Sequence, residues 1–296
     1  MIGSLDLTTL QQLWWLIVSV VGALFVFLTF VQGGQTLVLT LGRDESEKAM
    51  IINSIGRKWE LTFTTLVLFG GAFYASFPLF YASSFGCAYW VWIAILFTFV
   101  VQAVSFEYRK KPANLLGPRT YEIFMFINGS VGILLIGDAV GTFFAGSYFV
   151  LNDYNLVQWT HPLRGLEAAF SLFNLSLGLF LVFLARILGA LYLANNLDHD
   201  RLVPRLKNAA FNNLLCALPF LLYVLVSLLF MDGYAVSPES GTISVVSGKY
   251  LQNLLAMPGV LAMLAAGLLF ILLGAAVARR PSGKSGIRFS GHGSIL

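Results

Sequence analysis

Charged side chains are scarce in this chain of 296 residues. Asp, Glu, Lys and Arg make up 11% of it, whereas hydrophobic residues make up 58%. A soluble domain usually carries about 25% charged residues, and an 11% share cannot cover the surface that so many apolar residues would expose to water. The composition therefore excludes an ordinary soluble domain. The net charge of +4 does not indicate nucleic-acid binding, because the basic residues stand in loops between apolar runs.

Histidine and cysteine are also rare. The sequence has no CxxCH haem-attachment motif, no Walker motif, no HExxH and no cysteine ligand set. Its three histidines (His161, His199 and His292) fall in predicted loops, so a haem held between two helical histidines of this chain alone is excluded. Cys87 and Cys216 are predicted near opposite membrane faces, which disfavours a disulfide. The first twelve residues lack Lys and Arg, so we expect no secretory signal peptide.

Long apolar runs are what the sequence does have. A transmembrane helix needs roughly 20 apolar residues, and we predict seven spans, at about 13–41, 61–82, 88–106, 122–148, 166–193, 211–231 and 251–277. The runs are too long and too evenly apolar for half-buried strands, and the alternating segments of about 10 residues that a β-barrel needs are missing. The predicted fold class is an all-α polytopic membrane protein with a single transmembrane domain over residues 1–296.

Glycines recur inside the predicted spans, for example Gly70, Gly71, Gly129 and Gly132. They fit close helix packing and equally fit the general glycine richness of membrane helices. The final segment, 278–296, begins as a basic loop and then turns apolar. Its residues alone fit either a cytoplasmic tail or the start of a helix that has been cut off.

Basic residues divide unequally between alternate loops. Those on one side stand in or beside the loops after the first, third, fifth and seventh spans: Arg43, Lys48, Arg57, Lys58, Arg109, Lys110, Lys111, Arg119, Arg186, Arg201, Arg205, Lys207, Arg279, Arg280, Lys284 and Arg288. The other side has only Arg164 and Lys249. Because basic loops face the cytoplasm, we predict that the N-terminus is outside and residue 296 is cytoplasmic.

Ionisable residues within or beside the spans are candidate functional residues, because charge in a bilayer is costly. Asp138 lies about 24 Å beyond Glu122 along its predicted helix, and it is either a proton relay or a neutral or paired structural acid. Glu60, Glu107 and Glu122 stand at predicted cytoplasmic helix ends. They either collect protons or pair with the neighbouring basic residues Arg57, Lys58 and Arg109. Arg186 is close enough to its helix end to reach the interface.

Polar amides also occur inside the spans, and such residues more often join helices than bind ligands. They are Gln32, Gln35, Gln102, Asn128, Asn174 and Asn212.

Four segments carry a recognisable pattern. They are LGRDESEKAMIINSIGRKWE at 41–60, GGAFYASFPLFYASSFG at 70–86, FEYR at 106–109 and SLFNLSLGLFLVFLARILGALYLANN at 171–196. Together they resemble subunit II of the cytochrome bd quinol oxidases. The residues in these segments are similar to those of the branch seen in Bacteroidetes-type bacteria. The combination of LGR, INSI and a Trp–acid pair is fairly specific, and the likeness covers most of the chain from about residue 25 onward.

The resemblance implies a haem-free second subunit of a quinol oxidase in the bacterial inner membrane. Such a complex oxidises quinol, reduces dioxygen to water and generates a proton motive force. Haem b and haem d are expected in the partner, subunit I, whose helical bundles this chain would resemble in fold and which it would stabilise. A small single-helix subunit, membrane lipids and a structural quinone are further expected partners.

In some members of this family subunit II contributes a hydrophilic path from the cytoplasm. The acid of the family's Trp–acid pair falls on Glu60, after Trp59. The proton-path candidates are therefore Trp59, Glu60, Glu107, Glu122 and Asp138. No catalytic, cofactor-binding or metal-binding residue is expected in this chain.

The sequence departs from the family pattern in two places. VQGGQTL stands where many members have an Asp-Gly-rich segment late in the first span, and LTFTTL replaces polar residues that usually follow the Trp–acid pair. The family also typically has nine helices, so we expect residues 278–296 to end in the start of a truncated eighth helix. The alternative function is an independent secondary transporter whose ion path runs through Asp138 and the inner glutamates.

Overall fold

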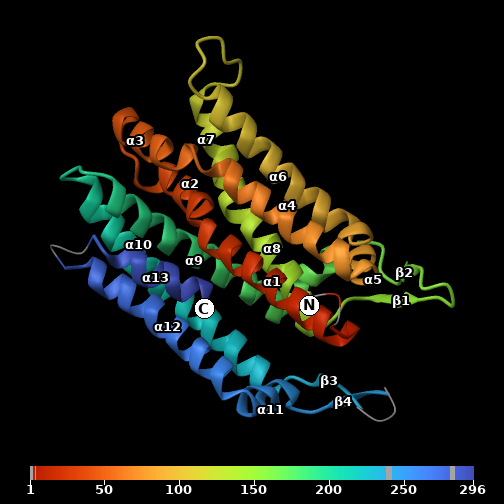
Figure 1. Cartoon of the computed structure of the whole chain (residues 1–296). Coiled ribbons are helices and arrows are strands. Elements are labelled where there is room, and N and C mark those ends of the chain that lie inside the picture. The colour runs from red at the N-terminus through yellow and green to blue at the C-terminus, as the bar shows by residue number, and fades with distance from the viewer. Residues whose placement is uncertain (1–2, 4, 238–241, 281–283) are drawn as a thin grey trace.

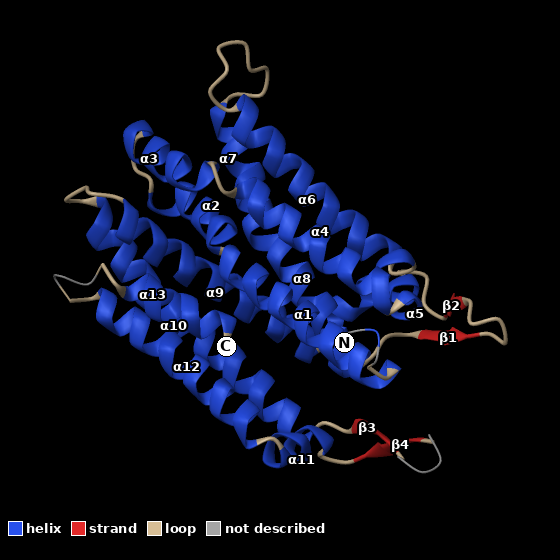
Figure 2. Ribbon diagram, viewed as in Figure 1, coloured by secondary structure: helices blue, strands red, loops and turns tan. Residues whose placement is uncertain are grey.

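Helices with roughly aligned axes form the body of the chain, and two short β-hairpins project from one end of it (Figures 1 and 2). The computed structural model describes residues 3, 5–237, 242–280 and 284–296. The helices are α1 (Leu7–Leu28), α2 (Phe30–Leu41), α3 (Glu45–Gly56), α4 (Trp59–Ser76), α5 (Pro78–Tyr81), α6 (Tyr89–Tyr108), α7 (Pro118–Ile127), α8 (Ile133–Ala145), α9 (Leu172–Asn196), α10 (Leu202–Phe230), α11 (Lys249–Ala256), α12 (Pro258–Ala278) and α13 (Gly286–Ile295). The π-helical turns are η2 (Ala82–Gly86) and η3 (Asn128–Gly132), and a 3-10 turn, η4, covers Leu166–Phe170.

The predicted fold class is confirmed. Among the described residues, six helical segments are long and apolar enough to cross a membrane: Leu7–Leu41, Tyr89–Tyr108, Pro118–Ala145, Leu172–Asn196, Leu202–Phe230 and Pro258–Ala278. The second predicted span, 61–82, is covered by α4 and α5. The 18-residue α4 is not among these six. Its first residues, WELTFTTL, include Glu60 and three threonines, which lower the hydropathy of the helix.

Several helices differ in extent from the predicted spans. α10 begins at Leu202, nine residues before the span predicted at 211, and so includes the basic Arg205 and Lys207. The span predicted at 251–277 is divided between α11 and α12, because Pro258 cannot continue a helix hydrogen-bond ladder and instead starts the new one. His292 was predicted in a loop and that was wrong, since it lies on α13, with its Nδ1 2.6 Å from the carbonyl oxygen of Arg288.

Strands were not expected, yet two antiparallel hairpins are present. β1 (Phe149–Leu151) pairs with β2 (Val157–Trp159), and β3 (Gly233–Val236) pairs with β4 (Ile243–Val246). The first hairpin had a visible turn signal in its loop, NDYN, where Asn155 adopts a positive φ of 59°. Both hairpins lie at the end of the bundle opposite α3 (Figure 1).

α9 is the centre of the packing and contacts α2, α8 and α10. Its crossing with α2 is so close that a Cβ atom on Gly33 would lie 1.7 Å from the carbonyl oxygen of Ala185. Gly129 is equally constrained, because its Cβ would lie 2.2 Å from the carbonyl oxygen of Gln32. Gly71, by contrast, faces open space. Close packing therefore accounts for Gly129 but not for Gly71.

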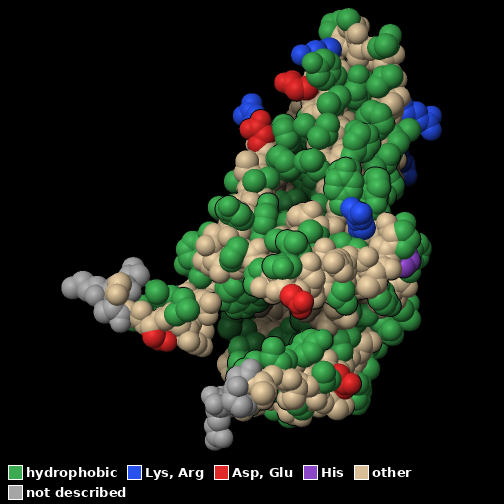
Figure 3. Space-filling model, turned by 90° about the vertical axis from the view of Figure 1, so that its right-hand side faces the viewer, with side chains coloured by type: hydrophobic (Ala, Val, Ile, Leu, Met, Phe, Trp, Pro, Cys, Tyr) green, Lys and Arg blue, Asp and Glu red, His purple; other side chains and the backbone are tan. Residues whose placement is uncertain are grey.

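The basic loops gather at one end of the bundle. The connections α2–α3, α6–α7 and α9–α10 lie at the end away from the hairpins, as do the end of α12 and the start of α13 (Figure 1). Figure 3 shows one face covered largely by hydrophobic side chains, with the visible Lys and Arg side chains in its upper half. The unequal charge predicted for alternate loops thus corresponds to two real ends of the molecule, which we call the basic end and the hairpin end.

Candidate functional site

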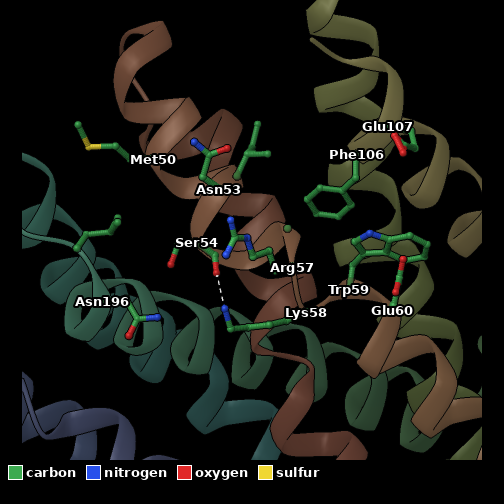
Figure 4. A pocket seen from close by; sticks show the side chains of 13 residues that line it. Met50, Asn53, Ser54, Arg57, Lys58, Trp59, Glu60, Phe106, Glu107 and Asn196 are labelled. Carbon is green, nitrogen blue, oxygen red and sulfur yellow. Dashed lines mark hydrogen bonds between the residues drawn. The ribbon is translucent and has the colours of Figure 1, made fainter. Parts of the chain in front are cut away.

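A polar cleft of about 990 Å³ opens at the basic end, between α3, α4, α6 and the end of α9 (Figure 4). Three of the five predicted path residues line it, namely Trp59, Glu60 and Glu107. The others along its wall are Met50, Ile52, Asn53, Ser54, Gly56, Arg57, Lys58, Phe106, Asn196 and Leu197. The structure therefore brings together residues from positions 59–60 and 107 that the sequence only placed on the same side of the membrane.

The local sequence explains how the cleft is built. α3 ends at Gly56 and α4 begins at Trp59, so the two helices are joined by only Arg57 and Lys58. The indole ring of Trp59 stacks on Phe106 of α6, with ring centroids 6.2 Å apart and planes 8° from parallel. The ammonium group of Lys58 donates a hydrogen bond of 3.0 Å to the carbonyl oxygen of Ser54 (Figure 4). The ring stacking and this hydrogen bond fix the start of α4, which carries Glu60.

Both carboxylates of the cleft are accessible to solvent, because Glu60 and Glu107 are exposed residues. Arg57 and Lys58 bring two positive charges to the same wall. A carboxylate in contact with water can exchange protons with it. The arrangement is therefore chemically able to exchange protons with water at the basic end. Among the described residues that line the cleft, no hydrogen bond joins a nucleophile to a base.

Glu122 does not share this cleft. It is 1% exposed, and its carboxylate accepts hydrogen bonds from Arg109 (Nε to Oε1, 3.0 Å) and Lys48 (Nζ to Oε2, 2.8 Å). Arg109 also bonds Glu45, with Nη2 2.8 Å from Oε2. We call these four residues the Glu122 network. It joins α3, the end of α6 and α7.

Arg109 is the residue that makes the Glu122 network costly to break. It is 4% exposed. Burial alone would lower its pKa, but the hydrogen bonds that Arg109 donates to Glu122 and Glu45, together with their negative charges, outweigh that effect and raise the pKa above its usual range. The guanidinium is therefore a permanent buried cation, and Glu122 is its buried counter-ion.

A second ion pair ties the start of α3 to α10. Glu47 is 3% exposed, accepts a hydrogen bond of 2.9 Å from the backbone N–H of Arg43, and pairs with the guanidinium of Arg205. The backbone hydrogen bond from Arg43, followed by the hydrogen bond and charge of Arg205, holds the pKa of Glu47 below its ordinary value. Arg205 also donates to the carbonyl oxygen of Leu41, so one side chain fixes the end of α2 as well.

Arg186, which the sequence predicted to reach the interface, makes hydrogen bonds to two other helices. Its Nε donates to Asn213 Oδ1 at 2.8 Å and its Nη1 donates to Thr36 Oγ1 at 2.6 Å, so it joins α9 to α10 and α2. The sequence pointed to Asn212 as a helix-joining residue. That was wrong, because Asn212 is exposed, and its buried neighbour Asn213 makes the contact.

The interior of the bundle holds several amides. Gln32, Gln35, Gln102 and Asn128 are fully buried. Asn128 joins η3 to α6 through a 3.3 Å hydrogen bond to Thr98, whereas the side chains of the three glutamines meet no hydrogen-bond partner among the described residues. The three glutamines are therefore buried between the helices without a hydrogen bond that joins one helix to another in the described structure.

Asp138 lies apart from the other candidates. It is 2% exposed and lines a different cavity, of about 490 Å³, beside the hairpins. The five predicted path residues thus fall into three places: Trp59, Glu60 and Glu107 in the cleft, Glu122 in its network, and Asp138 toward the hairpin end.

Sequence reasoning offered Arg109 as a pairing partner for the inner glutamates, and Glu122 does pair with it, but it missed the other partners of the buried acids. Glu45 and Lys48 stand three residues apart on one helix face, which is a visible signal. Nothing local connects Lys48 with Glu122 or Glu47 with Arg205, since these pairs are separated by 74 and 158 residues. Only the packing of α3 against its neighbours reveals them.

The histidines do not fit a haem held within this chain. His161 lies before η4 with Nδ1 3.7 Å from Glu167, His199 caps α10 by accepting from the backbone N–H of Leu202, and His292 is exposed. No group of three or more His, Cys, Asp or Glu side chains in the described part of the chain is arranged to hold a metal ion.

Comparison with known families matches residues 10–293 to the family described as cytochrome bd terminal oxidase subunit II. The match spans nearly the whole chain. This chain belongs to that family. The resemblance to this family, inferred from four sequence segments, is therefore confirmed. The assignment to the Bacteroidetes-type branch stays a prediction.

Curated relatives are similar over about half of the chain. Subunit 2 of the cytochrome bd-I ubiquinol oxidase of Escherichia coli (strain K12) is 31% identical over 157 residues, which is 53% of this chain and 41% of the relative. Subunit 2 of the cytochrome bd ubiquinol oxidase of Bacillus subtilis (strain 168) is 28% identical over 141 residues, 47% of this chain and 42% of the relative. The matched region thus covers less than half the length of these relatives.

A solved structure shares the fold. A chain of the bd oxidase from Geobacillus thermodenitrificans superposes with a TM-score of 0.69 over 97% of this chain and 82% of that chain, at 14% sequence identity. At this identity the likeness concerns the arrangement of the helices.

Proposed function

We propose that this chain is the haem-free second subunit of a cytochrome bd-type terminal oxidase, a complex that oxidises quinol and reduces dioxygen to water. The family match over residues 10–293 carries the proposal. The curated relatives are subunits of ubiquinol oxidases. The haems b and d would be bound by subunit I, since the three histidines of this chain do not converge inside the bundle.

The role toward subunit I would be structural. Large apolar side chains remain exposed along several helices, for example Leu61, Val67 and Leu68 on α4 and Phe97 on α6, which are 55% to 65% exposed. Such side chains require lipid or another membrane protein around them. A partner of similar fold that packs against this chain would cover part of that surface.

A proton path is the second part of the proposal. Oxygen reduction consumes protons, and drawing them from the cytoplasm builds a membrane potential. The cleft of Trp59, Glu60 and Glu107 offers two water-accessible carboxylates at the basic end. Gln102 on α6 and Gln35 on α2 are further polar side chains, both buried within the bundle. Glu122 would not carry protons, because its carboxylate is held by Arg109 and Lys48.

The deciding experiment is co-purification from the native membrane through a tag on this chain. The proposal expects a haem-containing partner to be retained, with haem d absorbance in that complex and quinol-dependent oxygen consumption. A stable, haem-free protein that moves a solute in liposomes would instead support the alternative, an independent secondary transporter.

The orientation is tested separately. Since basic loops face the cytoplasm, the loop before α3 should be inside. A cysteine introduced at the exposed position Ser46 should resist an impermeant thiol reagent in intact cells and react after the cells are opened. A matched cysteine at Asp153, in the β1–β2 loop at the opposite end, should react in intact cells. The reverse pattern would invert the topology.

A further inference from the structure

Arg186 is a cation inside a membrane-spanning helix, α9, and its partners are all neutral. Its guanidinium donates to Asn213 Oδ1 at 2.8 Å, to Thr36 Oγ1 at 2.6 Å and to Thr40 Oγ1 at 3.5 Å. None of the ion pairs among the described residues includes it. A charged side chain within a membrane span normally pairs with an opposite charge, so the described part of the chain leaves this guanidinium without a counter-ion.

Two other arginines that join helices show the usual arrangement. Arg109 is paired with Glu122, and Arg205 is paired with Glu47. Both of these arginines stand at the basic end, beside loops, where water is close. Arg186 lies deeper than either of them along its helix, ten residues before α9 ends at Asn196, and there an unneutralised charge is more costly.

The guanidinium of Arg186 is held in a fixed orientation with hydrogen-bonding capacity to spare. The hydroxyl of Thr36 and the amide of Asn213 donate their own hydrogens to carbonyl oxygens of their own helices, so toward Arg186 they act only as acceptors. A guanidinium has five N–H groups, and three are used here. The other two, one on each terminal nitrogen, match the two oxygens that a phosphate or carboxylate presents to an arginine fork.

These free donors lie at the surface of the bundle rather than in its core. Arg186 is partly exposed, and Thr40, Asn212 and Cys216 are exposed residues of the neighbouring helices α2 and α10. Cys216 stands one helical turn from Asn213, the residue that accepts from the guanidinium. A molecule outside the bundle can therefore reach the terminal nitrogens.

The depth of the guanidinium matches that of a lipid phosphate. Thr36 and Thr40 stand five residues and one residue before the end of α2 at Leu41, which is about 8 Å and about 2 Å at 1.5 Å per residue. The guanidinium that bonds both of them lies in this interval, just inside the basic end. Headgroups and acyl chains of a bilayer meet at such a position near the end of a spanning helix.

Apolar side chains continue from the guanidinium toward the middle of the bundle. Phe183 lies one turn from Arg186 on α9, on the side of the hairpin end, and its ring stacks on Phe220 of α10 with centroids 5.8 Å apart and planes 13° from parallel. Leu222, two residues further along α10, is 64% exposed. The charged group thus lies nearer the basic end and the apolar surface nearer the middle, in the order of a lipid headgroup and its chain.

We propose that this surface of α2, α9 and α10 binds one anionic phospholipid, such as phosphatidylglycerol, from the leaflet at the basic end. Nη1 and Nη2 of Arg186 would donate to two phosphate oxygens, and an acyl chain would lie against Phe183, Phe220 and Leu222. Basic sites between helices on the cytoplasmic side are typical of anionic lipid recognition. An ethanolamine lipid is less suited, because its ammonium group would be repelled by the guanidinium.

The test measures which lipid the protein retains. The full protein, with any partner it keeps, is reconstituted in nanodiscs that contain equal amounts of phosphatidylglycerol and phosphatidylethanolamine. After extraction in mild detergent, native mass spectrometry identifies the lipid that stays bound. We expect phosphatidylglycerol to be retained over phosphatidylethanolamine. Arg186→Gln should weaken this retention by roughly tenfold or more, because hydrogen bonds between charged groups are among the stronger ones.

Three further variants separate the site from net charge and from stability. Arg119→Gln removes the same charge from an exposed residue at the basic end, so it should retain the lipid as the unmodified protein does. Arg186→Lys keeps the charge but not the fork, and should lose part of the retention. Cys216→Trp adds bulk at the exposed surface while it leaves the hydrogen bonds of Arg186 intact, and should also reduce retention.

Three outcomes would overturn the proposal. One is equal retention of both lipids by the unmodified protein. Another is unchanged retention by a folded Arg186→Gln variant, which would leave the cation to a carboxylate of a partner protein. The third is displacement of the lipid by excess inorganic phosphate, which would make a free anion the ligand. Because the readout is bound lipid, it is independent of oxidase activity and of the proposed function.

Discussion

The glutamates at the basic end fall into two groups that look alike in sequence and behave differently in the structure. Glu122 and Glu47 are 1% and 3% exposed, and each is held by an arginine. Glu60 and Glu107 are exposed and face an open cleft. All four stand near helix ends beside basic residues, although the helix that holds Glu47, α3, was predicted as a loop.

The difference between these groups separates structural from functional acids. A carboxylate that is buried against a buried arginine contributes to holding helices together, and removing it leaves an uncompensated charge. An exposed carboxylate contributes little to stability but exchanges protons with water. Position at a helix end is common to both groups, so burial and partners decide the role.

The largest expected effect comes from breaking the Glu122 network. Glu122→Gln removes the counter-ion of the buried Arg109, and loss of one partner of a buried pair costs about 3–5 kcal/mol. The free energy of unfolding in detergent should fall by about that amount. Glu45→Gln is the matched control, because Glu45 bonds the same arginine but its side chain is 71% exposed, and it should cost at most about 1 kcal/mol. Equal costs for the two variants would contradict the distinction.

A smaller effect is expected from acid at Glu47. Its pKa is lowered from the ordinary value of 4.5, so the folded state holds fewer protons there than the unfolded state does. The stabilisation is fully present above 4.5 and is lost as the pH falls through the lower folded-state pKa. Thermal unfolding followed from neutral pH downward should show this decline, and Glu47→Gln should lack the part of it that Glu47 causes. A variant with the same acid dependence as the unmodified protein would assign the decline to other groups.

The smallest effect on stability is expected in the cleft. Glu60→Gln and Glu107→Gln should change the free energy of unfolding by no more than about 0.5 kcal/mol, because both side chains are exposed. If the cleft collects protons, Glu60→Gln should nevertheless slow oxygen consumption severalfold in the intact complex, with haem content unchanged. Asp153→Asn, an exposed acid at the hairpin end, is the control. Loss of haem together with activity would make Glu60 structural, and unchanged turnover would place the protons elsewhere.

Much of the architecture was predictable because a bilayer restricts sequences strongly. A spanning segment must be long and apolar, so runs such as 88–106 and 122–148 could be recognised as membrane spans from the sequence. The basic loops around Arg43, Arg109, Arg201 and Arg279 could be assigned to one end because they follow alternate predicted spans. The grouping of Trp59, Glu60 and Glu107 was only partly predictable, since composition indicates a shared side of the membrane and not a shared cleft.

What the sequence determined by itself is the class of protein, the asymmetry of its two ends and its family, because hydrophobic run length, charge in loops and motifs such as INSI are local properties. The tertiary structure alone decided which acids are paired. Lys48 meets Glu122 and Arg205 meets Glu47 across 74 and 158 residues, and Asp138 faces a cavity whose walls come from α6, α8 and both hairpins. The physical reason is that the state of a charge depends on its burial and on its neighbours in space, and the folded helices bring those neighbours together from distant parts of the chain.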